Sequence, residues 1–375
     1  MAGSTRLVDL VQSRLDGFLA EKGAGLAQIS PDLAIVDQTA RQLLGGGKRF
    51  RALFCYWGWR SIAALADESW AAADVAELDG PALEPIVSVA SALEVFHAAA
   101  LVHDDIMDNS DTRRGRPSLH KTFEALHAEH GWTGSGRQYG DASALLIGDL
   151  LLAWSDELFE AGASRARTRD AMVATRSEFS LMRTEVTVGQ YLDMLEEASW
   201  RTRPEAELLP RAHRVIVYKS AKYTVEAPLV IGASLAEASL AQLAALRDFG
   251  LPLGVAFQLR DDLLGVFGDP AVTGKPAGDD LREGKRTVLV TLARQKLPAS
   301  ALRLFDELLG DDSLDEHQIG MLQTTVRDSG AVEQVERIIA RNVEVATAVL
   351  VDAPLARAAR DELGALAETV TTRRS

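Results

Sequence analysis

The sequence predicts an all-α protein, and three observations support this fold class. Residues that favour helices, such as Ala, Leu, Glu and Arg, are abundant, whereas aromatic residues make up only 6% of the 375-residue chain. Apolar residues recur at helical spacing from Leu7 to Leu19. The stretch from Ile86 to Val102 is almost uniformly apolar, and a helix that is apolar on all sides belongs in a protein interior. We therefore expect one large helical bundle with this segment at its centre.

The first elements are two helices and a glycine turn that is rich in cations. A helix over residues 5–22 is expected to end at Gly23 to Gly25, and a second one runs from about Asp32 to Gly45-Gly46-Gly47. Three cations then stand at the start of a third helix: Lys48, Arg49 and Arg51. Backbone donors, a helix N-terminus and guanidinium groups together suit a phosphate, although a solvated loop is the alternative.

The central apolar segment ends in a cluster of carboxylates, Asp104-Asp105-Ile106-Met107-Asp108. Asp104 and Asp108 are four residues apart, so they lie on one helical face with Cβ atoms roughly 6 Å apart. Carboxylates at the end of an apolar helix are costly unless a cation meets them, and a pair at this spacing suits a hard cation. The alternative is an acidic helix end that faces water.

A second aspartate pair, Asp261-Asp262, follows another apolar segment. Two acidic clusters inside one fold would repel each other unless metal ions or a cationic group lay between them. The loop that follows contains Lys275 and Lys285 and is dense in glycine and cations, as a mobile lid over phosphate would be. From Thr287 onward the pattern indicates amphipathic helices to near the end of the chain.

These motifs resemble those of the trans-type polyprenyl diphosphate synthases. Asp104 to Asp108 looks like the first aspartate-rich motif of that family, and Asp261-Asp262 looks like the start of the second. Seven matches follow one another in the family's order between about Gly45 and Arg286. The resemblance implies a single domain over residues 1–375, with the helical fold of isoprenoid synthases and a central cavity. It also implies a prenyltransferase that condenses isopentenyl diphosphate head-to-tail with an allylic diphosphate.

The resemblance assigns roles to the residues that match the family's motifs. Several Mg²⁺ ions per active site are implied, with four ligands: Asp104, Asp108, Asp261 and Asp262. Isopentenyl diphosphate is expected to contact Lys48, Arg51, His97 and Arg114. The allylic diphosphate is expected to contact Arg113, Lys275 and Lys285. Catalytic roles fall on Lys219, Ser220 and Gln258, and a G-Q-x-x-D match adds Gln190 and Asp193 as secondary candidates. For His97 the alternative is an ordinary core histidine, and for the two arginines it is simple neutralisation of the aspartates.

Three positions carry further expectations. Ser220 stands where most family members have Thr, which keeps a hydroxyl and loses a methyl group. Gly265 occupies the fifth position of the second motif, where an aspartate is usual, so Asp261 and Asp262 are left to provide the metal contact. Pro228 should kink a helix expected from Arg211 to about Ala236.

The product length is expected to depend on the helix below the first motif. Ala99 and Ala100 stand where family members that stop at fifteen carbons have bulky aromatic residues. Phe96 is the next large side chain, about 4.5 Å deeper at the helical rise, which is close to one isoprene unit. We therefore predict a twenty-carbon product, geranylgeranyl diphosphate, with Phe96 as the plug. A longer product, with Phe96 as core and other helices limiting the tunnel, is the alternative.

Composition argues against several other classes. With 54 acidic and 40 basic residues the net charge is −14, which disfavours nucleic acid as a partner. A single cysteine, Cys55, leaves no disulfide framework and no thiolate metal site. We expect a cytoplasmic protein without a secretory signal or transmembrane segment, and the resemblance implies a homodimer. A terpene cyclase and a non-catalytic partner subunit remain as alternatives, although neither Asn109 nor Asn342 stands in a cyclase-type N-D-x-x-S-x-x-x-E motif.

Overall fold

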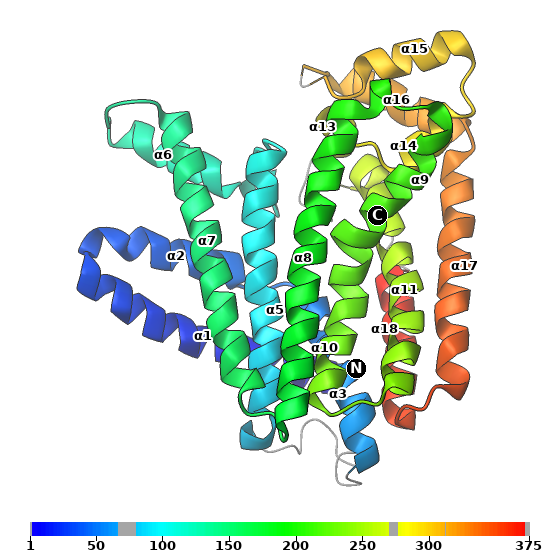
Figure 1. Cartoon of the computed structure of the whole chain (residues 1–375). Coiled ribbons are helices and arrows are strands. Elements are labelled where there is room, and N and C mark those ends of the chain that lie inside the picture. Colours follow the sequence, from blue (N-terminus) through cyan, green and yellow to red (C-terminus); the bar gives the residue numbers. More distant parts are fainter. Residues whose placement is uncertain (1, 67–79, 270–276, 312, 372–375) are drawn as a thin grey trace.

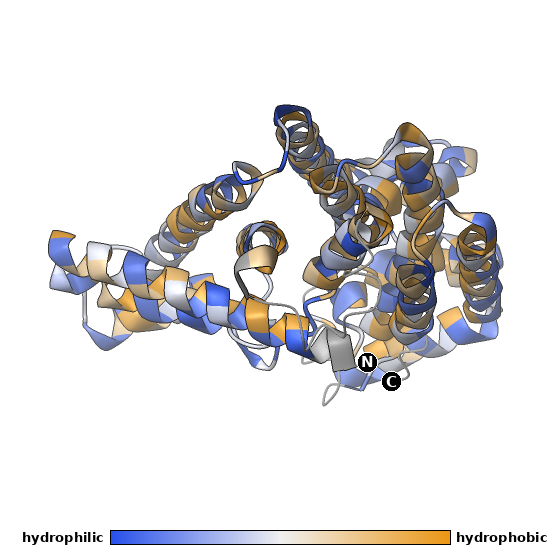
Figure 2. Cartoon of the chain, turned by 90° about the horizontal axis from the view of Figure 1, so that it is seen from below, coloured by the Kyte–Doolittle hydropathy of each residue, from blue (hydrophilic) through white to orange (hydrophobic). Residues whose placement is uncertain are grey.

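The computed structural model describes residues 2–66, 80–269, 277–311 and 313–371, and within these ranges the chain is an all-α bundle (Figure 1). The long helices of the bundle are seen nearly end-on in Figure 2, whereas α1 and α2 project to one side. The α-helices in the first half of the chain are α1 (Ala2–Ile29), α2 (Ala34–Leu44), α3 (Phe50–Ala66), α5 (Gly80–Met107), α6 (Leu119–Glu129) and α7 (Gly136–Ala163). Those that follow are α8 (Arg169–Ser199), α9 (Glu205–Val215), α10 (Ala227–Leu235), α11 (Leu240–Phe267), α13 (Asp279–Glu283), α14 (Val288–Arg294), α15 (Ala299–Leu308), α16 (Glu316–Asp328), α17 (Ala331–Asp352) and α18 (Arg357–Thr371). Shorter or wider helical segments are η1 (Pro31–Leu33), η3 (Trp200–Thr202) and the π-helix η4 (Ile216–Glu226).

The apolar segment of the sequence becomes α5, which packs against α1, α3, α7 and α10. Its residues from Ile86 to Val102 are mostly buried, as expected of a helix that is apolar on all sides. After α5 the chain forms a short antiparallel hairpin of β1 (Thr112–Arg113) and β2 (Arg116–Pro117), although Gly115 and Pro117 alone would favour a loop. Arg114 and Gly115 make the turn with φ of 53° and 71°.

Two clusters of buried apolar side chains form the interior. One lies among α1, α3, α5, α7 and α10, and the other lies among the helices from α13 to α17. Helix α11 contributes Phe249 and Leu253 to the first cluster and Leu259 and Leu263 to the second. The helix therefore joins the two clusters, and it carries the second aspartate pair close to its end.

The glycines that were expected to end the first helix do not do so, because α1 continues to Ile29. A Cβ atom at Gly23 would lie 2.7 Å from Asp37 Oδ1, so a glycine here lets α2 pack closely against α1. The helix ends instead before Pro31, where Ser30 is extended and accepts a hydrogen bond from the Asp32 N–H.

The stretch from His130 to Gly140 contains four glycines, a composition that favours a loop, but α7 already begins at Gly136. The Ser135 hydroxyl caps this helix by accepting a hydrogen bond from the Gln138 N–H. A Cβ atom at Gly140 would overlap the His120 carbonyl oxygen on α6. The glycines thus permit close helix packing, which the sequence pattern alone does not distinguish from a loop.

The helix expected from Arg211 to about Ala236 is present, but its middle is a π-helix rather than a simple proline kink. The segment runs from α9 through η4 to α10, and the Ala227 N–H bonds back to the Lys222 carbonyl, five residues earlier. Pro228 follows in the first turn of α10, where its missing N–H matters least. The wider π-turns fall at Lys219 and Ser220, which the sequence had singled out, and π-segments are frequent at functional sites.

Helices α5 and α11 are long and apolar enough to cross a membrane by length and composition alone. Within their apolar windows, 78% of the residues of the first and 39% of those of the second are buried inside the protein. A mostly buried core helix meets the same criterion, so α5 is explained by its place in the interior.

Candidate active site

A cavity of about 820 Å³ opens between α5, α8, η4, α11, the turn before α3 and the segment around α13. It is lined by most of the residues that the sequence had singled out: Lys48, Arg51, His97, Ala100, Asp104, Arg113, Arg114, Gln190, Asp193, Lys219, Ser220, Gln258, Asp261, Asp262 and Lys285. Asp104 and Asp261 therefore share one cavity. Asp108, Phe96 and Ala99 are not part of this lining, and Lys275 lies outside the described residues.

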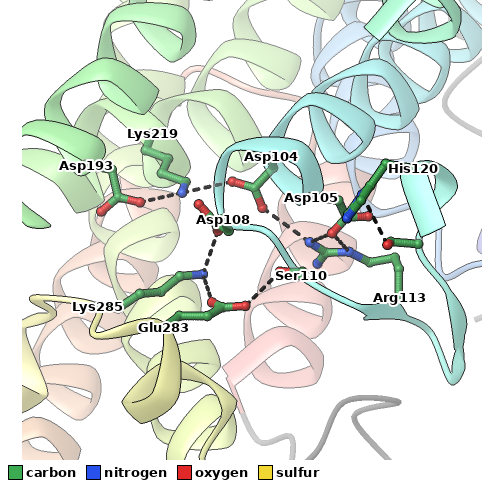
Figure 3. Close-up of polar contacts among 11 residues, drawn as sticks. Asp104, Asp105, Asp108, Ser110, Arg113, His120, Asp193, Lys219, Glu283 and Lys285 are labelled. Carbon is green, nitrogen blue, oxygen red and sulfur yellow. Dashed lines mark hydrogen bonds and ion pairs between the residues drawn. The ribbon is translucent and has the colours of Figure 1, made fainter. Parts of the chain in front are cut away.

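The carboxylates of the first motif are held by cations that come from distant elements (Figure 3). Asp104 lies 3.1 Å from Lys219 Nζ and 3.3 Å from Arg113 Nη2. Asp108 lies 3.1 Å from Lys285 Nζ. Asp105 points away from this group and accepts a 2.8 Å hydrogen bond from Arg113 Nε. Arg113 thus neutralises the motif in this structure, and a role on the allylic diphosphate stays a prediction.

Burial and the neighbouring cations shift the pKa values of these two carboxyls in opposite directions. Burial would raise the pKa of Asp104, but Lys219, Lys285 and Arg113 together lower it below its ordinary value. For Asp108 burial outweighs the attraction of Lys285, so its pKa is raised. Burial opposes the charge of Lys285, but Asp108, Asp280 and Glu283 raise its pKa well above the ordinary value. Lys285 therefore keeps its charge at neutral pH.

These residues fit divalent cations. Asp262 Oδ2 is a buried oxygen that accepts no hydrogen bond, and Asp104 Oδ1 and Asp108 Oδ2 are buried oxygens that each meet a lysine; carboxylate oxygens of this kind are the ligands that Mg²⁺ prefers. Among the described residues no group of three or more His, Cys, Asp or Glu side chains already stands close enough to hold a metal. The lysines against the first-motif carboxylates account for this, since each occupies an oxygen that a metal would take. A diphosphate that binds together with metal ions would supply both charges: the metal ions would meet the carboxylates, and the diphosphate would meet the lysines.

The second motif has a carboxylate that the sequence reasoning missed. A Cβ atom at Gly265 would overlap the carboxylate of Asp280, which reaches in from α13 and lines the cavity. The space left by the absent fifth aspartate is thus filled by another aspartate, from the segment beyond it. Asp280 is thus a third carboxylate beside this motif, and the metal contact through Asp261 and Asp262 stays a prediction. The only signal in the sequence was the pair Asp279-Asp280 in a glycine-rich loop.

Asp262 is the buried member of the second motif. Its Oδ1 accepts a 2.8 Å hydrogen bond from Gln258 Nε2, which explains why Gln258 stands one turn before it. Burial raises the pKa of Asp262 well above its ordinary value, and the hydrogen bond from Gln258 offsets only part of that effect. Asp261, by contrast, is exposed at the cavity wall.

A group of cations gathers at the opposite side of the cavity, around the glycine turn. Arg114 approaches Gly47 closely enough that a Cβ atom there would lie 3.8 Å from its Nη2. Arg51 donates a 3.0 Å hydrogen bond to Thr224 Oγ1 and lies over the ring of Tyr223, 4.4 Å from its centroid. His97 Nδ1 is 3.1 Å from the Tyr223 hydroxyl. Burial, followed by Arg51 and Arg114, holds the pKa of His97 well below its ordinary value, so the ring is neutral beside a strongly positive site.

Helix α8 meets the π-helix at the candidate residues of both. A Cβ atom at Gly189 would overlap the backbone of Lys219, so the glycine allows the two helices to touch. Asp193 pairs with Lys219 and thus shares this lysine with Asp104. Gln190 Nε2 is buried without a hydrogen-bond partner and lines the cavity. Both secondary candidates therefore belong to the site.

The aromatic residue expected to close the tunnel is part of a layer of rings, and one of these rings, that of Tyr223, lines the cavity. Phe96 is 4% exposed, and its ring lies 5.8 Å from that of Tyr223 and 6.3 Å from that of Phe179, centroid to centroid. Phe179 in turn stacks on Phe159 at 4.0 Å. Ala100 faces the cavity, whereas Ala99 is fully buried away from it. The sequence had singled out only Phe96, because its ring partners come from α7, α8 and η4.

A sequence model of the polyprenyl synthetase family matches residues 34–326 of this chain. The crystal structure of geranylgeranyl pyrophosphate synthase from Corynebacterium glutamicum, complexed with isoprenyl diphosphate and magnesium, is similar with a TM-score of 0.88. It is 36% identical in sequence, over 98% of this chain and 99% of that one. Geranylfarnesyl diphosphate synthase of Aeropyrum pernix is 30% identical over 89% of this chain and 92% of its own. Short chain isoprenyl diphosphate synthase of Methanocaldococcus jannaschii is 32% identical over 63% of this chain, a match that spans 64% of that relative.

Proposed function

Because this chain belongs to the polyprenyl synthetase family and is therefore an isoprenyl diphosphate synthase, we propose that its product is geranylgeranyl diphosphate. The observation that carries the proposal is the aromatic layer of Phe96, Phe179 and Tyr223 below a cavity whose wall at Ala100 is small. The names of its relatives range from short-chain to geranylfarnesyl synthases, so they bracket a twenty-carbon product without fixing it.

The cations of the site support binding of two diphosphates at separate places. Lys285 and Lys219 lie beside the aspartates and are held charged by them, so they suit the allylic diphosphate. Lys48, Arg51 and Arg114 surround the glycine turn and suit isopentenyl diphosphate. Both groups line one cavity, so the two substrates would meet inside it.

Mg²⁺ held by Asp104, Asp108, Asp261 and Asp262 would supply the charge that stabilises the diphosphate as it departs. The allylic C–O bond breaks, the double bond of isopentenyl diphosphate forms the new C–C bond, and a proton is lost. We assign that proton to the released diphosphate, because Ser220 and Gln258 line the cavity but are not basic.

The segment around α13 supports exclusion of water during this reaction. Ser110 Oγ donates a 2.7 Å hydrogen bond to Glu283 Oε1, and Glu283 Oε2 lies 2.8 Å from Lys285 Nζ (Figure 3). These contacts join the end of the first motif to α13, next to Lys285, which lines the cavity. An allylic cation would react with water, so a closed cover here protects it.

The test is incubation of the purified protein with isopentenyl diphosphate, each allylic starter in turn and Mg²⁺, followed by analysis of product length. We expect linear geranylgeranyl diphosphate as the main product. Linear products of another length would overturn the assignment of length alone. Cyclic hydrocarbons or absence of turnover would overturn the proposed reaction.

We also propose that the protein forms a homodimer through α7 and α8. These two consecutive helices expose five large apolar side chains, those of Leu145, Leu146, Leu181, Val188 and Tyr191, and exposed apolar side chains of this kind are typical of an interaction surface. Light scattering after size-exclusion chromatography should give the mass of two chains, and Leu146→Asp should shift it toward one. A wild-type monomer would refute this part of the proposal.

A further inference from the structure

A buried ion pair joins the turn before α3 to the middle of α5. Arg49 Nη1 lies 3.4 Å from Glu94 Oε2, and the two side chains are only 4% and 7% exposed. In the sequence Arg49 was one of three cations at the glycine turn, and Glu94, inside the apolar segment, was given no role. Breaking such a pair is costly because it leaves one charge buried without a partner.

The pair holds the backbone of the turn from both ends. Glu94 Oε1 accepts a 3.1 Å hydrogen bond from the Ala52 N–H in the first turn of α3, so Glu94 caps that helix from α5. Arg49 Nη2 donates to Gln12 Oε1 on α1 at 2.7 Å and to the Leu44 carbonyl at the end of α2. Four helices are thus tied to one turn by two side chains.

The turn requires such support because its backbone is unusual. Gly46 and Gly47 have φ of 67° and 95°, which glycine adopts at little cost. Arg49 has φ of 50°, a left-handed conformation that a residue with a Cβ atom seldom adopts. Strain of this kind persists where surrounding contacts enforce it, and it is common at binding sites. The contacts of Arg49 with Glu94 and Gln12 are of that kind.

The cations that the proposed function assigns to isopentenyl diphosphate flank this turn. Lys48 precedes Arg49 directly, and Arg51 follows two residues later; both line the cavity. Glu94 lines the same part of the cavity, but a carboxylate would repel a diphosphate, so direct contact does not explain its presence. Its hydrogen bond to Ala52 and its contact with Arg49 do explain it.

We propose that Glu94 and Arg49 are positioning residues, which fix residues 46–52 so that Lys48 and Arg51 meet the diphosphate of isopentenyl diphosphate. This inference rests on the proposed function and identifies what orders one of its two substrate sites. The allylic site, formed by Lys219 and Lys285, is tied to other elements and should be independent of the pair.

The substitution Glu94→Gln distinguishes a positioning role of Glu94 from a purely electrostatic effect of its charge on the diphosphate. The substitution removes a negative charge beside an anion site, so a purely electrostatic role predicts a lower KM for isopentenyl diphosphate. Positioning predicts a higher KM, by roughly tenfold if one charge-assisted contact is lost, with the KM of the allylic substrate within about twofold of wild type. Glu94→Asp, which keeps the charge, should recover part of the loss. Calorimetric titration with isopentenyl diphosphate alone should show the same order of affinities.

The matched control is Glu196→Gln. Glu196 pairs with Arg211 at 2.6 Å; the Glu196 side chain is also 7% exposed and that of Arg211 is 16% exposed, but Glu196 does not line this cavity. This variant should lose stability without a change in either KM. If Glu94→Gln does not fold, the double variant Arg49→Met, Glu94→Leu replaces both charges by apolar groups and should fold with the same loss of isopentenyl diphosphate affinity.

Five outcomes decide the inference. Selective weakening of isopentenyl diphosphate binding supports it. A lower KM for that substrate, or an equal rise in both KM values, overturns it. An unchanged KM for isopentenyl diphosphate in Glu94→Gln or the double variant also overturns it while leaving the proposed function intact. Wild-type protein that neither binds nor extends isopentenyl diphosphate would instead reject the proposed function, and this inference with it.

Discussion

Replacing Phe96 by Ala should lengthen the product by about one isoprene unit. Phe96 lies one helical turn below Ala100 on α5, and its ring lies 6.3 Å from that of Phe179 on α8, centroid to centroid. One isoprene unit spans roughly three residues of helical rise, about 4.5 Å, so removal of the ring frees depth for one unit before Phe179 blocks the chain. The expected main product therefore changes from twenty to twenty-five carbons.

The same substitution should cost stability, because Phe96 is 4% exposed and packs on two other rings. Truncation of a buried Phe to Ala usually costs about 3–5 kcal/mol, so the assay is best run at low temperature with unfolding followed in parallel. Products made from labelled isopentenyl diphosphate are dephosphorylated and separated by length. Phe305→Ala is the control, since Phe305 is 2% exposed in the other apolar cluster and should cost similar stability without changing the product. An unchanged product from Phe96→Ala would refute the assignment of the plug.

Three further outcomes follow from the charges and close contacts of the site. Lys285→Ala should lower kcat/KM for the allylic substrate by about ten- to a hundredfold, because it removes a charged donor; an unchanged value would contradict its place in that site. Burial, followed by Arg51, depresses the pKa of His97, so on acidification the unfolded chain binds the proton first. The free energy of unfolding should therefore fall below about pH 6.5, and it should fall less in His97→Gln. Denaturant midpoints measured between pH 7 and 5 would show both effects. Gly265→Asp should lower activity although it completes the usual motif, because the new side chain would overlap Asp280. Adding Asp280→Ala to this variant should restore much of the activity. Full activity of Gly265→Asp alone would contradict this reasoning.

The polar contacts indicate how the free enzyme keeps so many charges in one cavity. Lys219 is shared by Asp104 and Asp193, and Lys285 is shared by Asp108 and Glu283. Each lysine thus neutralises carboxylates from two elements before any substrate is bound.

Several features followed from the sequence by itself, because they depend on local spacing. A four-residue interval places Asp104 and Asp108 on one helical face in any helix, and uninterrupted apolar residues around Ile86 require a buried helix. The order of the motifs along the chain indicated the family, which the match over residues 34–326 confirms. Glycines were less informative, since Gly23 and Gly140 allow helices to approach rather than ending them.

Tertiary structure alone decided which side chains meet across elements. Nothing in the local pattern pairs Glu94 with Arg49, directs Lys219 to Asp104, or brings Asp280 into the space beside Gly265. The physical reason is that a helix specifies the face on which a side chain lies, whereas its partner depends on how helices far apart in the chain pack together. The surroundings of Phe96, on which the proposed product length depends, are likewise set by helix packing, because the rings of Phe179 and Tyr223 that lie against it belong to other helices.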